Sequence, residues 1–162
     1  MPRKPTAAAS STKSTVSCDF ATTTWAGLPA GSKVFVDTTP FICLLESDPQ
    51  LADRFAGLFE AASQGALSIA LSTVTLAEVL AGPHKAGQPA LAKRFEKALC
   101  QYEVVPVSVS IAALAGQLRA KHRLKLPDAL QLATALETGA AAFVTQDRDF
   151  SRVTALPVIT GA

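Results

Sequence analysis

Four acidic residues of this chain stand where a carboxylate does not help folding: Asp37, Glu78, Asp128 and Asp147. Each has apolar residues close to it in the sequence. A carboxylate among apolar neighbours is costly unless water, hydrogen bonds or a cation compensate its charge. Four such carboxylates in one chain of 162 residues predict a shared cation. A cation held in this way suits chemistry on a phosphate group.

Two of these acids follow segments predicted to be buried strands. Asp37 comes directly after the apolar run Val34–Val36, and Asp147 follows the strand predicted at 141–145. Ligands of parallel sheets bind outside the carboxyl ends of the strands, so we expect Asp37 and Asp147 to share that edge. A simple turn is the ordinary alternative, because Asp is common directly after a strand.

Asp128 stands in the first turn of a helix predicted from Pro127 to Gly139. A negative charge is favourable there in any case. The helix is apolar nearly all round, with Glu137 as its only other charge, so it is expected to be largely buried. Asp128 must then line an interior cleft or find a partner.

Glu78 lies in a helix that Ser72 or Thr73 is predicted to cap and that is expected to stop at Gly82–Pro83. Its neighbours are mostly apolar, a pattern that does not indicate a solvated face. A side chain that points to solvent from a surface helix is the ordinary alternative.

Apolar segments and helical patterns alternate along the chain, which predicts an α/β domain with a mainly parallel sheet of four to five strands. Helices are expected on both faces, one of them capped by Ser110. Residues 1–31 are rich in Ala, Ser and Thr and predict a flexible tail before a domain that spans 32–162. Trp25 is expected to dock on the domain or on a partner. The predicted strands are 33–36, 67–71, 104–107, 141–145 and 158–160.

The segments around the four acids resemble, in order and spacing, the acidic motifs of the PIN domain family. Successive acids are 41, 50 and 19 residues apart. The small size is similar to that of the VapC-like toxins of bacterial toxin–antitoxin pairs, which are ribonucleases. The match covers about residues 33–162 and implies a PIN-like three-layer α/β/α sandwich. The matching segments are Val36–Thr39, Leu76–Val79, Leu126–Ala129 and Val144–Phe150.

The resemblance implies that the four acids are catalytic and bind one or two Mg²⁺ or Mn²⁺ ions, hard cations that prefer oxygen ligands. Asp149 is an alternative to Asp147 as the fourth ligand, because both fall in the last motif. Thr38 and Thr145 are candidates to hydrogen-bond the ligands or a water. Hydroxyl groups at strand ends also serve as ordinary caps.

The implied reaction is hydrolysis of RNA by a metal-dependent endoribonuclease, which would be the toxin of a toxin–antitoxin pair. A cognate antitoxin and a homodimer are the implied protein partners. Two alternatives are a housekeeping PIN nuclease of RNA processing and a PIN-fold binding module without catalysis. An aspartate-nucleophile phosphatase is disfavoured, since it needs a second Asp where Thr39 stands.

The formal net charge of +2 does not by itself indicate a nucleic-acid partner. With the four acids on a metal, 15 Lys and Arg residues face only nine other acids, which leaves +6 and suits a polyanion. Several basic residues stand close before Asp128 in the sequence. They are predicted to place favourable positive charge at the C-terminus of a helix, to form a rim that contacts RNA phosphates, or to do both. The candidate RNA contacts are Arg119, Lys121, Arg123, Lys125 and Arg148.

Cysteine usage and hydropathy favour a cytoplasmic protein. The three cysteines form no C-x-x-C pair, so neither a zinc site nor a disulfide framework is indicated. Mean hydropathy is +0.28, yet the longest uncharged stretch of the folded region, 61–77, is too short and polar for a membrane span. No secretory signal is recognised at the N-terminus.

Overall fold

The structure is a computed structural model, which describes residues 25–46 and 49–160. Most of the predicted tail, residues 1–24, lies outside these residues. The elements before the third strand are η1 (Trp25–Gly27), β1 (Ser32–Val36), α1 (Thr38–Glu46), α2 (Pro49–Ser63), β2 (Leu67–Ser72), α3 (Thr73–Lys85) and α4 (Pro89–Leu99). The later elements are β3 (Glu103–Val105), α5 (Val109–His122), α6 (Leu126–Glu137), β4 (Ala142–Val144), η2 (Arg148–Arg152) and β5 (Val158–Ile159).

The strands form one parallel five-stranded sheet in the order β3-β2-β1-β4-β5, which confirms the predicted α/β sheet. The chain runs from β1 outward through β2 to β3 and then crosses to β4 on the other side of β1. β1 and β4 are in register, with Val36 opposite Val144. The direction of winding therefore reverses between these two strands, and such a switch point opens a crevice at their carboxyl ends.

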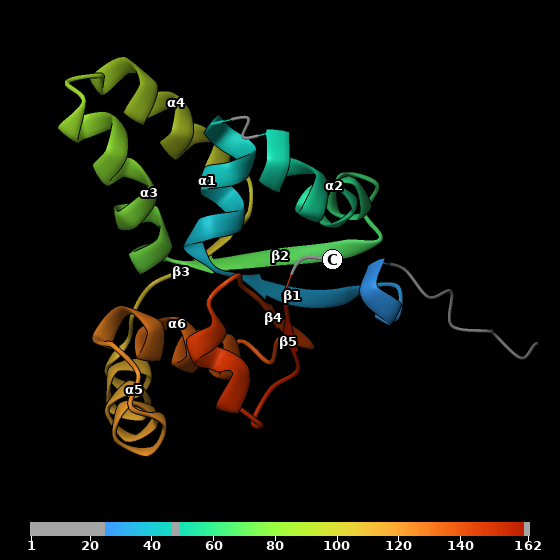
Figure 1. The fold of residues 1–162 in the computed structure, drawn as a ribbon, viewed down its shortest axis with the longest axis vertical. Coiled ribbons are helices and arrows are strands. Elements are labelled where there is room, and N and C mark those ends of the chain that lie inside the picture. Colours follow the sequence, from blue (N-terminus) through green and yellow to red (C-terminus); the bar gives the residue numbers. More distant parts are fainter. Residues whose placement is uncertain (1–24, 47–48, 161–162) are drawn as a thin grey trace, which may run out of the picture.

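Helices cover both faces of the sheet, as expected for a three-layer sandwich (Figure 1). Helices α1 to α4 lie on one face, and α5 and α6 lie on the other with η2. Side chains of β1 alternate between the two layers, because successive residues of a strand point to opposite faces. Val34 and Val36 join the core under α1 to α4, whereas Phe35 joins the core with α5, α6 and Phe143.

Two predicted helix boundaries were wrong. The helix expected to stop at Gly82–Pro83 continues to Lys85, with Pro83 inside its last turn. A proline there removes one intrahelical hydrogen bond, and its ring is buried. The helix expected to be capped by Ser110 is capped by Ser108, whose hydroxyl accepts the Ile111 N–H at 3.2 Å.

Trp25 docks on the domain. Its side chain packs at the edge of the core under α1 to α4, and its segment contacts α2. A Cβ atom placed on Gly57 of α2 would lie 3.0 Å from the Trp25 ring, so the absence of a side chain at residue 57 makes room for the indole. Within the described part of the chain, no helix combines the length and the apolar character needed to cross a membrane.

Candidate metal-binding active site

Asp37 sits at the switch point, directly after β1. Its N–H donates to the carbonyl of Val144 at 2.9 Å, which ties it to the end of β4. Both carboxylate oxygens accept hydrogen bonds, Oδ1 from the Thr38 N–H at 2.7 Å and Oδ2 from the Thr145 hydroxyl at 2.6 Å. The carboxylate is therefore fixed between the ends of two neighbouring strands.

The electrostatic surroundings of Asp37 place other acids close to it. Burial raises the pKa of Asp37 to about 6, although the hydrogen bonds from Thr145 and Thr38 pull it down. The negative charges of Glu78 and Asp128 push this pKa up further. Carboxylates from three separate segments thus lie near enough for their charges to repel one another.

Glu78 reaches this group from α3, and its Oε2 accepts a hydrogen bond from the Thr38 hydroxyl. The expectation that Glu78 avoids a solvated face was wrong, because its side chain is exposed. Its neighbours Thr75 and Val79 form the buried side of α3, and Glu78 lies beside them at the open rim. Thr38 thus holds one acid with its N–H and a second with its hydroxyl.

Asp128 is half-buried in the first turn of α6. The prediction of a buried helix is confirmed, since residues 129 and 131–135 are buried. Burial is the largest cause that raises the pKa of Asp128, and the negative charge of Asp147 is the next. The positive charge of Lys125 lowers this pKa, whereas the charges of Glu78 and Asp149 raise it further. Oδ2 of Asp128 is buried and has no hydrogen-bond partner among the described residues. A buried carboxylate oxygen without a partner is energetically costly, so we expect a ligand to contact it.

Asp147 and Asp149 complete the cluster after β4. The Asp147 N–H donates to the Thr145 hydroxyl at 3.0 Å, and its Oδ1 accepts the Asp149 N–H at 2.8 Å, which caps η2. One carboxylate oxygen from each of Asp128, Asp147 and Asp149 lies within 4.8 Å of the others. The last motif therefore contributes two acids to the cluster rather than one alone.

The donor set suits a hard divalent cation. The ligand atoms are carboxylate oxygens, and no Lys, Arg or His of the described residues forms an ion pair with any of these five acids. Mutually repelling carboxylates without paired cations are costly, and a divalent ion compensates them. The unpartnered Oδ2 of Asp128 is an oxygen that such an ion would satisfy.

A buried hydrogen-bond network stands behind the acids and centres on Gln131 of α6, which is 1% exposed. Its Oε1 accepts from the Ser72 hydroxyl at 2.7 Å. Its Nε2 donates to the hydroxyls of Thr75 at 2.8 Å and Thr38 at 3.2 Å. Because Thr38 accepts this bond, its single hydroxyl proton remains available for Glu78.

Comparison with known proteins assigns the family. Residues 34–156 match the family model of the PIN domain. The chain belongs to the PIN domain family. This confirms the resemblance read from the four acidic motifs, and residues 34–156 include all five acids of the cluster. No curated protein sequence matches the chain.

Solved structures of toxin–antitoxin proteins share this PIN domain fold. A toxin–antitoxin complex from Klebsiella pneumoniae is 28% identical, with 78% of this chain and 96% of that chain covered and a TM-score of 0.63. VapBC2 from Rickettsia felis, bound to a promoter DNA fragment, is 20% identical, with coverage of 80% and 99% and a TM-score of 0.67. VapC20 from Mycobacterium tuberculosis, a sarcin–ricin loop cleaving toxin, is 19% identical, with coverage of 75% and 95% and a TM-score of 0.59.

In the structure of the PIN domain, Asp128, Asp147 and Asp149 form one close group, and Asp37 and Glu78 are connected to each other through Thr38. One further residue, which sequence reasoning missed, lies behind them. Thr38 and Thr145, the two predicted hydroxyl residues, both contact acids of the cluster. Gln131 was not singled out, although a Gln between Leu130 and Leu132 in a helix expected to be buried was the available signal. A buried polar side chain needs partners, and here the partners lead to the site.

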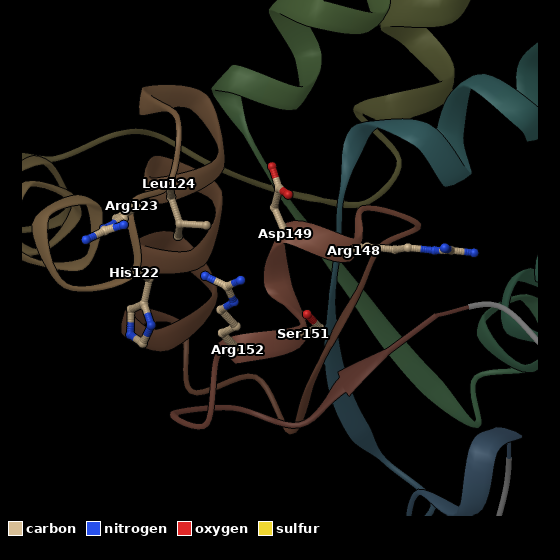
Figure 2. Close-up of a pocket in the computed structure, with 7 residues that line it drawn as sticks. All are labelled: His122, Arg123, Leu124, Arg148, Asp149, Ser151 and Arg152. Atoms are coloured by element: carbon tan, nitrogen blue, oxygen red, sulfur yellow. The ribbon is translucent and has the colours of Figure 1, made fainter.

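The candidate RNA contacts lie in two groups outside the acidic cluster, one before α6 and one in η2. Arg119, Lys121, Arg123 and Lys125 are exposed at the end of α5 and in the loop before α6. Arg148 is exposed at the start of η2. Between these two groups the surface is hollowed beside Asp149 (Figure 2).

Proposed function

We propose that this PIN domain is a Mg²⁺- or Mn²⁺-dependent endoribonuclease that hydrolyses RNA phosphodiester bonds. The observation that carries the proposal is the convergence of carboxylates at the β1–β4 switch point, where one buried oxygen of Asp128 has no partner. Asp37, Glu78, Asp128 and Asp147 would hold the ion, with Asp149 as a fifth acid in reach of the same centre.

The chemistry is divided between the ion and the side chains. A divalent ion held by these acids would activate a water molecule and stabilise the negative charge that develops on the phosphate. Thr145 and Thr38 fix the direction in which the Asp37 oxygens point. Thr38 does the same for Glu78. A carboxylate positioned in this way orients or deprotonates the attacking water. No Ser, Cys or His nucleophile is needed.

RNA would approach across the basic surface beside the acids. Exposed Arg and Lys side chains neutralise phosphates along a strand and let the acidic centre accept a polyanion. Arg119, Lys121, Arg123 and Lys125 lie on the α5 side, and Arg148 lies on the η2 side. An RNA substrate also fits the predicted cytoplasmic location.

The biological role we propose is that of a toxin restrained by a cognate antitoxin, with a homodimer as the working unit. Support comes from the Klebsiella structure, which is a toxin–antitoxin complex. An apolar hollow of about 420 Å³ between α1, α3 and α4 offers a place for an antitoxin segment. Leu45, Pro83, Leu91 and Phe95 contribute to its lining.

Cleavage of a structured RNA with Mg²⁺, with Mn²⁺ and with EDTA tests the catalytic proposal. Asp128→Asn should lower the cleavage rate by at least about 100-fold while the protein remains folded, because it removes a ligand charge without changing shape. Asp53→Asn, which alters an exposed acid of α2, is the matched control and should retain full activity. Undiminished cleavage in EDTA, or by Asp128→Asn, would refute the mechanism.

The toxin role is tested separately. Expression of the wild-type chain in bacteria should arrest growth, and expression of Asp128→Asn should not. Normal growth with an active enzyme would favour the alternative of a housekeeping nuclease. Absence of both cleavage and metal binding by calorimetry would favour a binding module.

A further inference from the structure

A second polar site adjoins the acidic cluster. It is a cavity of about 210 Å³ between η2 and the end of α5, shown in Figure 2. Pockets for drug-sized ligands measure about 300–1,000 Å³, so this one suits a smaller group. Among the described residues that line it, Leu124 is the one with an apolar side chain. The residues used below are His122, Arg123, Leu124, Arg148, Asp149 and Arg152.

Arg152 supplies the positive charge inside the cavity. Its guanidinium group lies between Leu124 and His122, whereas those of Arg123 and Arg148 point away on opposite sides (Figure 2). No carboxylate of the described residues pairs with Arg152 at ion-pair distance, and the side chain is exposed. Its five N–H donors are therefore free for an anion, and their planar fork matches phosphate oxygens.

His122 strengthens the polar character of the wall. Its Nε2 is buried and has no hydrogen-bond partner among the described residues. Because this nitrogen is closed off from solvent, His122 contributes a wall of the cavity, and the anion-binding donors come from Arg152. A nucleobase would need a larger or more apolar surface than Leu124 provides.

Asp149 places this cavity next to the proposed centre of catalysis. Its carboxylate belongs both to the acidic cluster and to the cavity lining. In Figure 2 it points away from Arg152, so its charge does not occupy the cationic part of the cavity. An anion held by Arg152 would thus sit beside the metal ligands but outside their shell.

We propose that this cavity is a phosphate subsite, in which Arg152 holds an RNA phosphate other than the one that is cleaved. The inference rests on the proposed nuclease function and specifies how the substrate strand is held. A phosphate anchored on the η2–α5 side sets the position of the strand relative to the acids. Binding at this subsite depends on charge and not on base identity.

Binding of a fluorescently labelled single-stranded RNA, measured by anisotropy in EDTA at several salt concentrations, tests the subsite without any cleavage. Arg152→Ala should weaken binding about tenfold, the loss expected for one charge-assisted contact. The slope of log affinity against log salt should become shallower by about 0.7, the value for one phosphate contact on a single strand. Arg152→Lys should keep the slope and recover part of the affinity, since the charge stays and the fork is lost.

Arg94→Ala is the matched control, because Arg94 is an exposed arginine of α4 on the opposite face of the sheet. It should change neither affinity nor slope. Equal unfolding temperatures of the two alanine variants show that the fold is retained. An Arg152→Ala protein that binds like Arg94→Ala, or a wild type that does not bind RNA, overturns the subsite. Cleavage assays on Asp128→Asn decide the nuclease proposal independently of either result.

Discussion

The hydroxyl of Thr145 donates a hydrogen bond of 2.6 Å to Oδ2 of Asp37, which lies 108 residues earlier in the chain. The same hydroxyl accepts the N–H of Asp147 at 3.0 Å. One fully buried side chain therefore connects the acid at the end of β1 with the backbone that carries the acids after β4. The geometry of the site depends on the two strands being neighbours.

Replacement of Thr145 by Val should distinguish the role of Thr145 in positioning Asp37 from its role in folding. The change keeps the side-chain shape and removes the donor, so the pKa of Asp37 should rise above its present value of about 6. We expect a loss of about 1–2 kcal/mol in the free energy of unfolding and a cleavage rate that falls by about tenfold or more. A pH–rate profile measures the shift. Thr145→Ser, which keeps the hydroxyl, should restore the wild-type profile, and a Val variant with that profile would contradict the assignment.

Gln131→Leu should weaken both stability and catalysis. The leucine has a similar volume, but it leaves the hydroxyls of Ser72 and Thr75 buried without their amide partner. The free energy of unfolding should fall by about 2–4 kcal/mol in urea denaturation. Activity should fall as well in the fraction that stays folded, because Thr38 loses the donor that directs its proton to Glu78. Gln117→Leu, on the exposed side of α5, is the control and should leave both quantities unchanged.

Asp128→Asn should stabilise the metal-free protein although it removes activity. The substitution relieves the repulsion that Asp147, Glu78 and Asp149 exert on Asp128. In EDTA we expect the unfolding temperature to rise by about 2–4 °C, the shift that about 1 kcal/mol gives in a domain of this size. Scanning calorimetry with and without Mg²⁺ measures it. The wild type should gain stability with Mg²⁺, whereas a comparable gain in Asp128→Asn would argue against this residue as a ligand.

The raised pKa of Asp37 predicts opposite effects of pH on stability and on metal binding. Native Asp37 keeps its proton up to about pH 6, whereas the unfolded chain releases it near the ordinary value of 3.8. Between these values the native state binds more protons, so the contribution of Asp37 to the free energy of unfolding falls as pH rises, by about 2–3 kcal/mol in all. Mg²⁺ needs the ionised carboxylate, so its affinity should rise over the same interval.

Urea denaturation in EDTA at pH 5 and pH 7.5 checks the first effect, and calorimetric titration with Mg²⁺ checks the second. Asp37→Asn removes the titrating group and should reduce the difference in stability between the two pH values. The same difference in wild type and variant would show that another group causes it.

Docking of Trp25 on α2 can be followed with its own fluorescence, because Trp25 is the only tryptophan of the chain. Trp25→Ala should lower the free energy of unfolding by about 2 kcal/mol through lost packing. Gly57→Ala should be neutral or unfavourable in the wild type, where the new methyl would lie 3.0 Å from the indole. In the Trp25→Ala background the same change should stabilise by about 1 kcal/mol, since alanine is the better helix former. Additive effects of the two changes would exclude the contact.

The sequence determined the parts of this protein that depend on local patterns. Apolar runs located the strands of the sheet, and the nearly apolar helix of Asp128 indicated burial that the structure confirms. The order and spacing of four acids were enough to recognise the PIN domain. These features can be recognised in the sequence because the hydrophobic periods of strands and helices extend over only a few residues. Each acid also lies within or directly beside the strand or helix that positions it.

Only the tertiary structure decided how these pieces act on one another. The exposure of Glu78 depends on where α3 meets the sheet edge, and the role of Gln131 depends on hydroxyls 56 to 93 residues away. The cavity of Arg152 exists because η2 and the end of α5 are brought together by the crossing of the chain from β3 to β4. Contacts over such separations leave no periodic signal in a single sequence, because the winding of the sheet brings together residues that are distant along the chain.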